Sequence, residues 1–285
     1  MKINLQDITL CVADSVTPSL ALRAIKKSQE HCDFNRSILF TDVEMESSGS
    51  HEVVRIDKLK SINDYAYFIL KKLNKYIKTN YVLVIQWDGY VIDPNAWNNI
   101  YYDYDYIGAK WHWHKDGNNI GNGGFSLRSK NLLDSTASTE FNFLENVPED
   151  VQICRVNRSF LAKQHSIKFP NEDIADDFSY ERSAPISPTF GFHGFFNMWR
   201  HCDDFEICEI IKNLNHKSYK SREYLELMIN YYSLGKFSQV RMMYEKLMTV
   251  MSPLDFLSAL KLFIDDMDFI VKFSKFCDKL IRNSQ

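Results

Sequence analysis

Short apolar runs alternate with amphipathic stretches along the first ninety residues, and this alternation restricts the fold more than any other feature of the sequence. The apolar runs predict strands at residues 8–13, 37–41, 53–56 and 81–85. Apolar side chains at helical spacing predict helices within residues 17–25 and 62–77. Because strands that alternate with helices form parallel sheets, the sequence predicts an α/β domain with a mostly parallel central sheet flanked by helices.

Polar segments follow three of these predicted strands. They are residues 13–15 (ADS), Asp42 and residues 86–88 (QWD). The carboxyl ends of parallel strands meet at one edge of a sheet, and ligands of open α/β sheets bind at that edge. The sequence therefore predicts a ligand site that these three segments share.

The character of the chain changes near residue 203, which divides it into two predicted domains, residues 1–202 and 203–285. The second domain contains only helical patterns, at residues 205–214, 222–233, 237–251, from Pro253 onward, and 269–281. The segment YYSLGKFSQVRMMYEKL is similar to one tetratricopeptide-like helical hairpin, although a single unit does not make an array. This helical extension either covers the first domain or docks a partner protein.

Asp88 is the first candidate for chemistry, because an apolar strand delivers it to the predicted ligand edge. A divalent cation favours carboxylate oxygens, and it offsets the charge that develops on a leaving diphosphate. The following Gly89 would allow close approach of the backbone to a ligand. An isolated aspartate after a strand is also common as a helix cap or turn residue, so both interpretations stay open at this point.

Two further segments combine turn residues with acids. Residues 121–124 (GNGG) allow a tight turn that approaches a ligand closely, and an ordinary structural turn is the alternative. Glu149 and Asp150 open an apolar-periodic stretch, where acids favour a helix N-terminus. A carboxylate at this position would also be able to deprotonate an acceptor hydroxyl.

Histidines occur in two aromatic segments. His193, in FGFHG, is either a metal ligand or a satisfied core residue. His112 and His114, in WHWH, either line a pocket or lie on the surface.

Charge and cysteine content exclude several classes of protein. The net charge is −3 without a basic stripe, so nucleic acid is not an expected partner. The six cysteines form no CxxC pair, which favours reduced thiols in a cytoplasmic protein over zinc sites or disulfides. No apolar run approaches the roughly 20 residues of a transmembrane helix, so we expect at most peripheral association with the inner membrane.

Taken together, six segments resemble a bacterial family of glycosyltransferase-like proteins that is catalogued as a domain of unknown function. The segments occur in the order QWDGYVIDP, YDYIGAKW, GNGGFSLRS, PEDVQIC, FSYE and FGFHGF, and the resemblance covers roughly residues 8–200. The family is similar in layout to galactosyltransferases of the GT-A type. The resemblance implies a GT-A-like, Rossmann-like fold, a nucleotide-sugar donor and a manganese or magnesium ion.

The resemblance also implies roles for residues around the metal and the acceptor. Asp88 matches the final acid of the Asp-x-Asp metal motif, and Gln86 stands where the first acid would be, so one negative charge is missing. His193 matches a histidine that completes the metal shell in several GT-A enzymes. Asp150, with Glu149 beside it, matches the acid that serves as base in inverting relatives.

Further matches concern the donor and acceptor cleft. The loop Ala13, Asp14 and Ser15 matches the place of the nucleotide base and ribose, with Asp42 as a weaker match for the same pocket. Gly123 and Gly124 match the glycine turn that lines the cleft, and the neighbouring Asn122 is a candidate for the same lining. The rings of Trp87, Trp111 and Trp113 are candidate surfaces on which an acceptor stacks.

The resemblance therefore predicts an inverting, metal-dependent hexosyltransferase. It would move a sugar, UDP-hexose being the generic donor, to a saccharide or glycolipid hydroxyl during assembly of a bacterial surface polysaccharide. The alternative is a protein of the same fold that has lost activity and binds a sugar, a nucleotide or a protein partner of the helical extension. A metal-dependent hydrolase would need more metal ligands than these segments offer.

Overall fold

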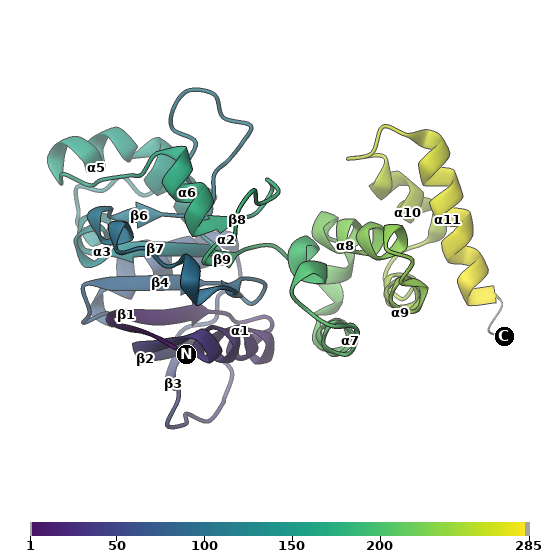
Figure 1. The fold of residues 1–285 in the computed structure, drawn as a ribbon, viewed down its shortest axis with the longest axis horizontal. Helices are drawn as coiled ribbons and strands as arrows, with labels where there is room; N and C mark the ends of the chain where they lie inside the picture. Colours follow the sequence, from purple (N-terminus) through teal and green to yellow (C-terminus); the bar gives the residue numbers. More distant parts are fainter. Residues whose placement is uncertain (1, 283–285) are drawn as a thin grey trace. The chain divides into compact units, whose positions relative to one another are not determined.

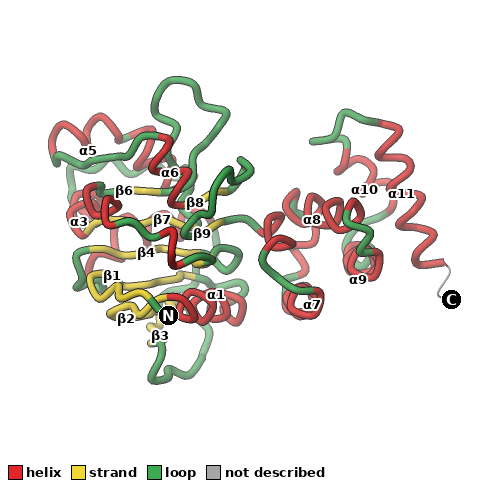
Figure 2. Tube along the Cα trace, viewed as in Figure 1, coloured by secondary structure: helices red, strands yellow, loops and turns green. Residues whose placement is uncertain are grey.

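The computed structural model describes residues 2–282, which divide into one compact unit that ends at His193 and another that begins at Gly194. This division lies a little before the predicted boundary at residue 202. All strands belong to the first unit, and in Figure 2 the second unit contains only helices and loops. The predicted α/β class with a C-terminal helical extension is confirmed.

The first unit is built on a six-stranded sheet in the order β3-β2-β1-β4-β7-β6 (Figure 1). The strands are β1 (Ile3–Ala13), β2 (Cys32–Thr41), β3 (Glu52–Arg55), β4 (Tyr81–Ile85), β6 (Tyr106–Ile107) and β7 (Phe125–Ser129). Strand β1 pairs in parallel with β2 and β4, and β2 pairs in parallel with β3. Strand β7 runs antiparallel to both of its neighbours. The predicted mostly parallel sheet is therefore confirmed, with one strand reversed.

Both faces of the central strands are buried, which explains why the run YVLVI has no polar position. Alternate residues of β1, β2 and β4, among them Cys11, Phe40 and Val84, form a cluster with Phe68, Leu73 and Leu133. Residues of the opposite parity, such as Leu10, Leu39 and Leu83, are also buried.

Helices connect and flank these strands. They are α1 (Pro18–His31), α2 (Ile62–Tyr67), α3 (Lys130–Ala137), α4 (Glu149–Val151), α5 (Arg158–Gln164) and α6 (Glu172–Phe178). Local sequence sets where they begin: Pro18 occupies the first turn of α1, and the hydroxyl of Ser61 accepts a hydrogen bond from the Asp64 amide at the start of α2. The predicted helix over residues 62–77 continues past α2 as a π-helical turn and a 3₁₀ turn.

A second, three-stranded sheet was not predicted. Its order is β5-β9-β8, with β5 (Tyr90–Val91), β8 (Ser179–Tyr180) and β9 (Gly191–Phe192). Strand β9 pairs antiparallel with β5 and parallel with β8. Two-residue strands carry too little periodicity to be recognised from one sequence.

The second unit consists of helices α7 (Asp204–Asn213), α8 (Arg222–Ser233), α9 (Phe237–Leu247), α10 (Pro253–Leu260) and α11 (Met267–Arg282). Helices α8 and α9 form the predicted hairpin, in which Gly235 adopts a left-handed φ of 70° and the Tyr224 hydroxyl donates to the Met243 carbonyl at 2.9 Å. Among the described residues, no helix is both long and apolar enough to span a bilayer.

Candidate active site

The small sheet gathers three polar side chains at one of its ends. Because β8 and β9 are parallel, with Tyr180 opposite Phe192, the residues that follow them, Glu181 and His193, emerge side by side. Strand β5 runs the other way, with Tyr90 opposite Phe192, so Asp88, which precedes this strand, arrives at the same end. Sequence positions about a hundred residues apart thus meet through strand pairing.

His193 is the centre of this group. Its Nε2 lies 3.4 Å from Oδ1 of Asp88 and 3.2 Å from Oε1 of Gln86. Its Nδ1 lies 3.2 Å from Oε1 of Glu181 and 3.1 Å from Nδ2 of Asn122. Burial lowers the pKa of His193, but the carboxylates of Asp88 and Glu181 outweigh it and raise the pKa to about 10. The two carboxylates therefore favour the protonated ring, and a divalent cation would have to replace the proton on Nε2.

The glycine turn forms the wall beside His193. The backbone amide of Gln86 donates to the Gly124 carbonyl at 2.8 Å, and this hydrogen bond fixes the turn against the end of β4. A Cβ atom on Gly124 would lie 2.1 Å from His193 Nε2, so only glycine allows this approach. Asn122 is buried and has a left-handed φ of 55°. Asn122 and Gly124, two of the residues predicted to line the donor and acceptor cleft, thus lie beside His193.

We expect Gly124→Ala to lower the free energy of unfolding by about 1–3 kcal/mol, because the added methyl group forces His193 or the turn to move. Gly49→Ala is the matched control, since nothing lies within 4 Å of a Cβ at that position, and it should change stability by less than about 0.5 kcal/mol. Urea unfolding of both variants measures the difference. Equal effects of the two substitutions would show that the close approach to His193 is absent in solution.

Asp150, on α4, contacts the same glycine turn. Its Oδ2 accepts a hydrogen bond from the Gly123 amide at 2.9 Å, and its Oδ1 accepts one from the Val151 amide at 2.7 Å. Burial raises the pKa of Asp150 to about 7, and the negative charge of Glu149 adds to the rise. A carboxyl group with a pKa near neutrality suits a general base.

Glu149 points away from this role, because it forms a buried ion pair. Its Oε1 lies 2.9 Å from Nη2 of Arg128, and the two side chains are 6% and 0% exposed. Arg128 also donates from Nε to the Ser126 hydroxyl at 2.9 Å. A Cβ on Gly123 would lie 2.0 Å from Glu149 Oε1, so the ion pair packs directly against the glycine turn. This placement favours a positioning role for Glu149 over direct catalysis.

The loop after β1 lies at the predicted edge of the sheet. Asp14 accepts hydrogen bonds from the amides of Val16 and Thr17, both at 2.6 Å, and thereby shapes the turn into α1. Burial raises the pKa of Asp14, and the charge of Asp88 adds to the rise. Ala13 is buried at the end of β1.

Ser15 and Asp42, which were also predicted to bind the nucleotide-sugar donor, have different surroundings. The Ser15 hydroxyl accepts a hydrogen bond from the Leu59 amide at 3.0 Å, which ties this loop to the segment after β3. Oδ1 of Asp42 is buried and has no hydrogen-bond partner among the described residues.

The three predicted stacking tryptophans differ in exposure. Trp111 is 5% exposed and packs in a core cluster with Tyr106 and Leu132, so its placement favours packing over direct contact with an acceptor. Trp113 is 50% exposed, and Trp87 is half-buried beside Asp88 in the chain. Of the three, Trp113 offers the most open ring.

Sequence reasoning missed the roles of Glu181 and Arg128. Glu181 belongs to the FSYE segment, and its function becomes visible only when β8 and β9 are known to be adjacent. Arg128 is fully buried and pairs with Glu149, but it alternates with Phe125 and Leu127 in FSLRS, so the sequence alone places it on the polar face of the strand.

Two oxygen atoms that can bind a divalent cation lie near Nε2 of His193. Asp88 Oδ1 and Gln86 Oε1 lie 3.4 Å and 3.2 Å from His193 Nε2, and neighbouring ligands of an octahedral ion with bonds of about 2.1 Å are about 3 Å apart. Within residues 2–282, no three His, Cys, Asp or Glu side chains form a metal cluster. The chemistry of the three groups is compatible with a divalent cation, for which a substrate would have to supply further ligands.

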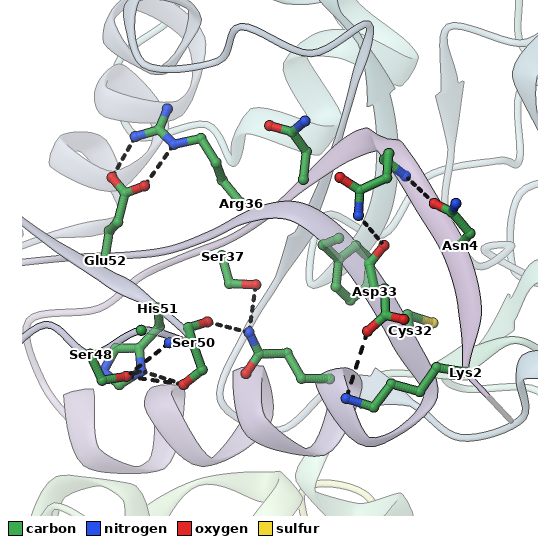
Figure 3. Close-up of a pocket in the computed structure, with 15 residues that line it drawn as sticks. Lys2, Asn4, Cys32, Asp33, Arg36, Ser37, Ser48, Ser50, His51 and Glu52 are labelled. Atoms are coloured by element: carbon green, nitrogen blue, oxygen red, sulfur yellow. Dashed lines mark hydrogen bonds and ion pairs between the residues drawn. The ribbon is translucent and has the colours of Figure 1, made fainter.

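A separate cavity of about 570 Å³ lies at the opposite, amino ends of β1, β2 and β3 (Figure 3). Its polar side chains mostly bond to each other. Arg36 pairs with both carboxylate oxygens of Glu52, and Gln29 donates to the Ser37 hydroxyl at 2.9 Å. The cavity contains none of the predicted site residues.

No curated protein matches the sequence. Among solved structures, the galactosyltransferase LgtC in complex with donor and acceptor sugar analogues matches with 12% identity over 65% of this chain and 86% of that chain, with a TM-score of 0.37. An active-site variant of LgtC matches with 12% identity over 72% of this chain and 94% of that chain, with a TM-score of 0.40. The model of the family described as "Protein of unknown function (DUF5672)" matches residues 50–193, half of the chain, and the protein belongs to this family.

Proposed function

We propose that the protein is a glycosyltransferase that moves a hexose from a nucleotide-diphosphate donor to a hydroxyl group of a saccharide or glycolipid acceptor. The observation that carries this proposal is the convergence of two groups on one glycine turn. Asp88 and His193 lie beside Gly124, and Asp150 accepts a hydrogen bond from Gly123. One glycine turn thus positions both a candidate cation-binding group and a candidate base.

Asp88, His193 and Gln86 are the residues that would hold a manganese or magnesium ion. Such an ion offsets the charge of the leaving diphosphate. Glu181 accepts from the other ring nitrogen of His193, as carboxylates commonly do behind a metal-bound imidazole, and it fixes the ring orientation. With Gln86 in place of an acid, the chain supplies one carboxylate and one imidazole, so we expect metal binding to depend on the diphosphate of the donor.

The loop after β1 is our candidate for the nucleoside of the donor. Ser15 ties this loop to Leu59, which lines a cavity of about 540 Å³ together with Tyr67, Tyr76 and Lys72. Aromatic rings and cations suit a nucleobase and its phosphates. Leu59 connects this cavity to Ser15, which was predicted to bind the nucleotide-sugar donor, and this connection supports the cavity as the place of the nucleoside.

Asp150 is our candidate base. Its carboxylate would remove the proton of the acceptor hydroxyl as the hydroxyl oxygen attacks the anomeric carbon, while the bond to the diphosphate breaks and the diphosphate leaves with the electron pair. Attack from the face opposite the leaving group inverts the anomeric configuration. Glu149 and Arg128 hold α4 and the glycine turn in place during this step.

The test is release of UDP from UDP-glucose and UDP-galactose in the presence of manganese, followed by NMR of the anomeric proton of the product. We expect release that depends on manganese and a product of inverted configuration. The Asp88→Asn variant should lose activity by about two orders of magnitude or more, because charge stabilisation of the leaving group is a large catalytic contribution. The proposal would be contradicted if the protein released no nucleotide diphosphate from all of the UDP-, GDP- and dTDP-sugars tested.

A further inference from the structure

The segment between β6 and β7 is a hairpin that is held by backbone hydrogen bonds and an ion pair. Lys110 and Ile120 form a β-bridge, and the Trp111 amide donates to the Asn119 carbonyl at 2.7 Å. Arg155 reaches the tip, where it binds both carboxylate oxygens of Asp116 at 2.8 Å. Because these contacts fix the backbone at its base and its tip, the hairpin presents its side chains in a defined arrangement.

A cavity of about 260 Å³ opens in this hairpin. Its lining residues are mostly polar, and they are Lys110, His112, His114, Lys115, Gly117, Asn119 and Glu172. Asn119 is 6% exposed, and within residues 2–282 its side-chain amide has no hydrogen-bond partner. Asn119 lines the cavity, so its amide oxygen and nitrogen are available there to accept from and donate to a ligand or water.

An open aromatic ring stands next to the cavity in the chain. Trp113 lies between the two lining histidines, is 50% exposed, and leans on the buried Trp111 ring with centroids 6.3 Å apart at 30°. The apolar C–H face of a pyranose ring packs on such a ring, while its hydroxyl groups need planar polar partners. The hairpin supplies both kinds of group.

The charges of the cavity favour a neutral ligand over an anion. The Lys110 ammonium is already paired with Asp176 and lies 3.7 Å from Glu172. A phosphate group would meet these carboxylates, whereas sugar hydroxyls both donate and accept, and so match a lining that mixes ammonium, amide, imidazole and carboxylate groups.

We propose that the hairpin cavity, with Asn119 inside and Trp113 at its rim, binds one neutral hexose ring of the acceptor. This inference rests on the proposed transferase function and names the residues that hold its acceptor. Asn119 is joined by only four residues to Gly123, whose amide binds Asp150, and four residues span at most about 14 Å. A saccharide of two or three rings anchored in the cavity would therefore reach the base.

The test measures binding by saturation-transfer NMR with methyl β-galactoside and methyl β-glucoside, on wild type, Trp113→Ala, Asn119→Ala and the control Asn118→Ala. Asn118 is exposed in the same hairpin and does not line the cavity. We expect at least one hexoside to bind, with a Kd that rises about tenfold in the first two variants and stays unchanged in the control. Thermal unfolding of each variant verifies that it is folded.

Three results would overturn the inference: no binding of either hexoside at millimolar concentration, equal affinity in Trp113→Ala, Asn119→Ala and wild type, or displacement of the hexoside by inorganic phosphate. UDP release in the absence of acceptor is measured on wild type and on the control Asn118→Ala, and we expect it in both. Loss of that release in wild type would contradict the proposed function, whereas release together with any of the three results would contradict the acceptor site alone.

Discussion

Asp150→Asn is expected to lower kcat by about 10³, within the range of 10² to 10⁴ that a general base contributes, while UDP binding stays unchanged. Asparagine keeps the shape of the side chain and an oxygen for the Gly123 amide, but it cannot take a proton. Asp173→Asn is the control, because Asp173 is an exposed acid in the first unit and should tolerate the change. A loss of less than tenfold in Asp150→Asn would remove Asp150 from the mechanism.

The pH profile provides a second readout for the same residue. Burial and the charge of Glu149 raise the pKa of Asp150 to about 7, so the carboxyl is protonated and inactive as a base below that pH. We therefore expect kcat/KM of the wild type to rise with pH through about 7, and this limb should be absent from the residual activity of Asp150→Asn. A flat wild-type profile between pH 5 and 8 would contradict the assignment.

Glu149→Gln is expected to lower the free energy of unfolding by about 3–5 kcal/mol. The substitution leaves the fully buried guanidinium of Arg128 without the carboxylate that it contacts at 2.9 Å. Such a cost is a large part of the total stability of a typical domain, so the variant should unfold at a clearly lower urea concentration.

The double variant Arg128→Met with Glu149→Leu separates this cause from a general loss of packing. Apolar replacement of both members of a buried ion pair is often neutral or stabilising, so the double variant should recover most of the stability that Glu149→Gln loses. If the double variant is less stable than Glu149→Gln, the effect comes from volume and shape at this position and not from an unpaired charge.

The sequence was sufficient for the elements with strong periodicity. Strand β4 matches the predicted residues 81–85, and helix α8 matches the predicted residues 222–233. A short continuous apolar run indicates a buried strand, and a regular helical face indicates a helix, so each pattern favours one type of secondary structure. The two-residue strands β5, β8 and β9 escaped prediction, since pairing partners far apart in sequence define them.

The site shows the same division between local and long-range information. Asp88 was predicted from its place after β4, and in the structure its Oδ1 lies 3.4 Å from Nε2 of His193. The contact of Glu181 with His193 depends on the register of β8 against β9, which no local pattern reveals. Trp111 was predicted as a stacking surface from its aromatic ring, and Glu149 was predicted from its place beside Asp150. The burial of both side chains depends on the packing of other segments around them.

Calorimetric titration with UDP, with and without manganese, on wild type and Asp88→Ala tests the central claim most directly. The account predicts that UDP binds the wild type only when manganese is present and that Asp88→Ala does not bind it under either condition. The contradicting result is UDP binding of equal affinity with and without the metal ion, or in wild type and Asp88→Ala alike, because the diphosphate would then be held without the site around His193.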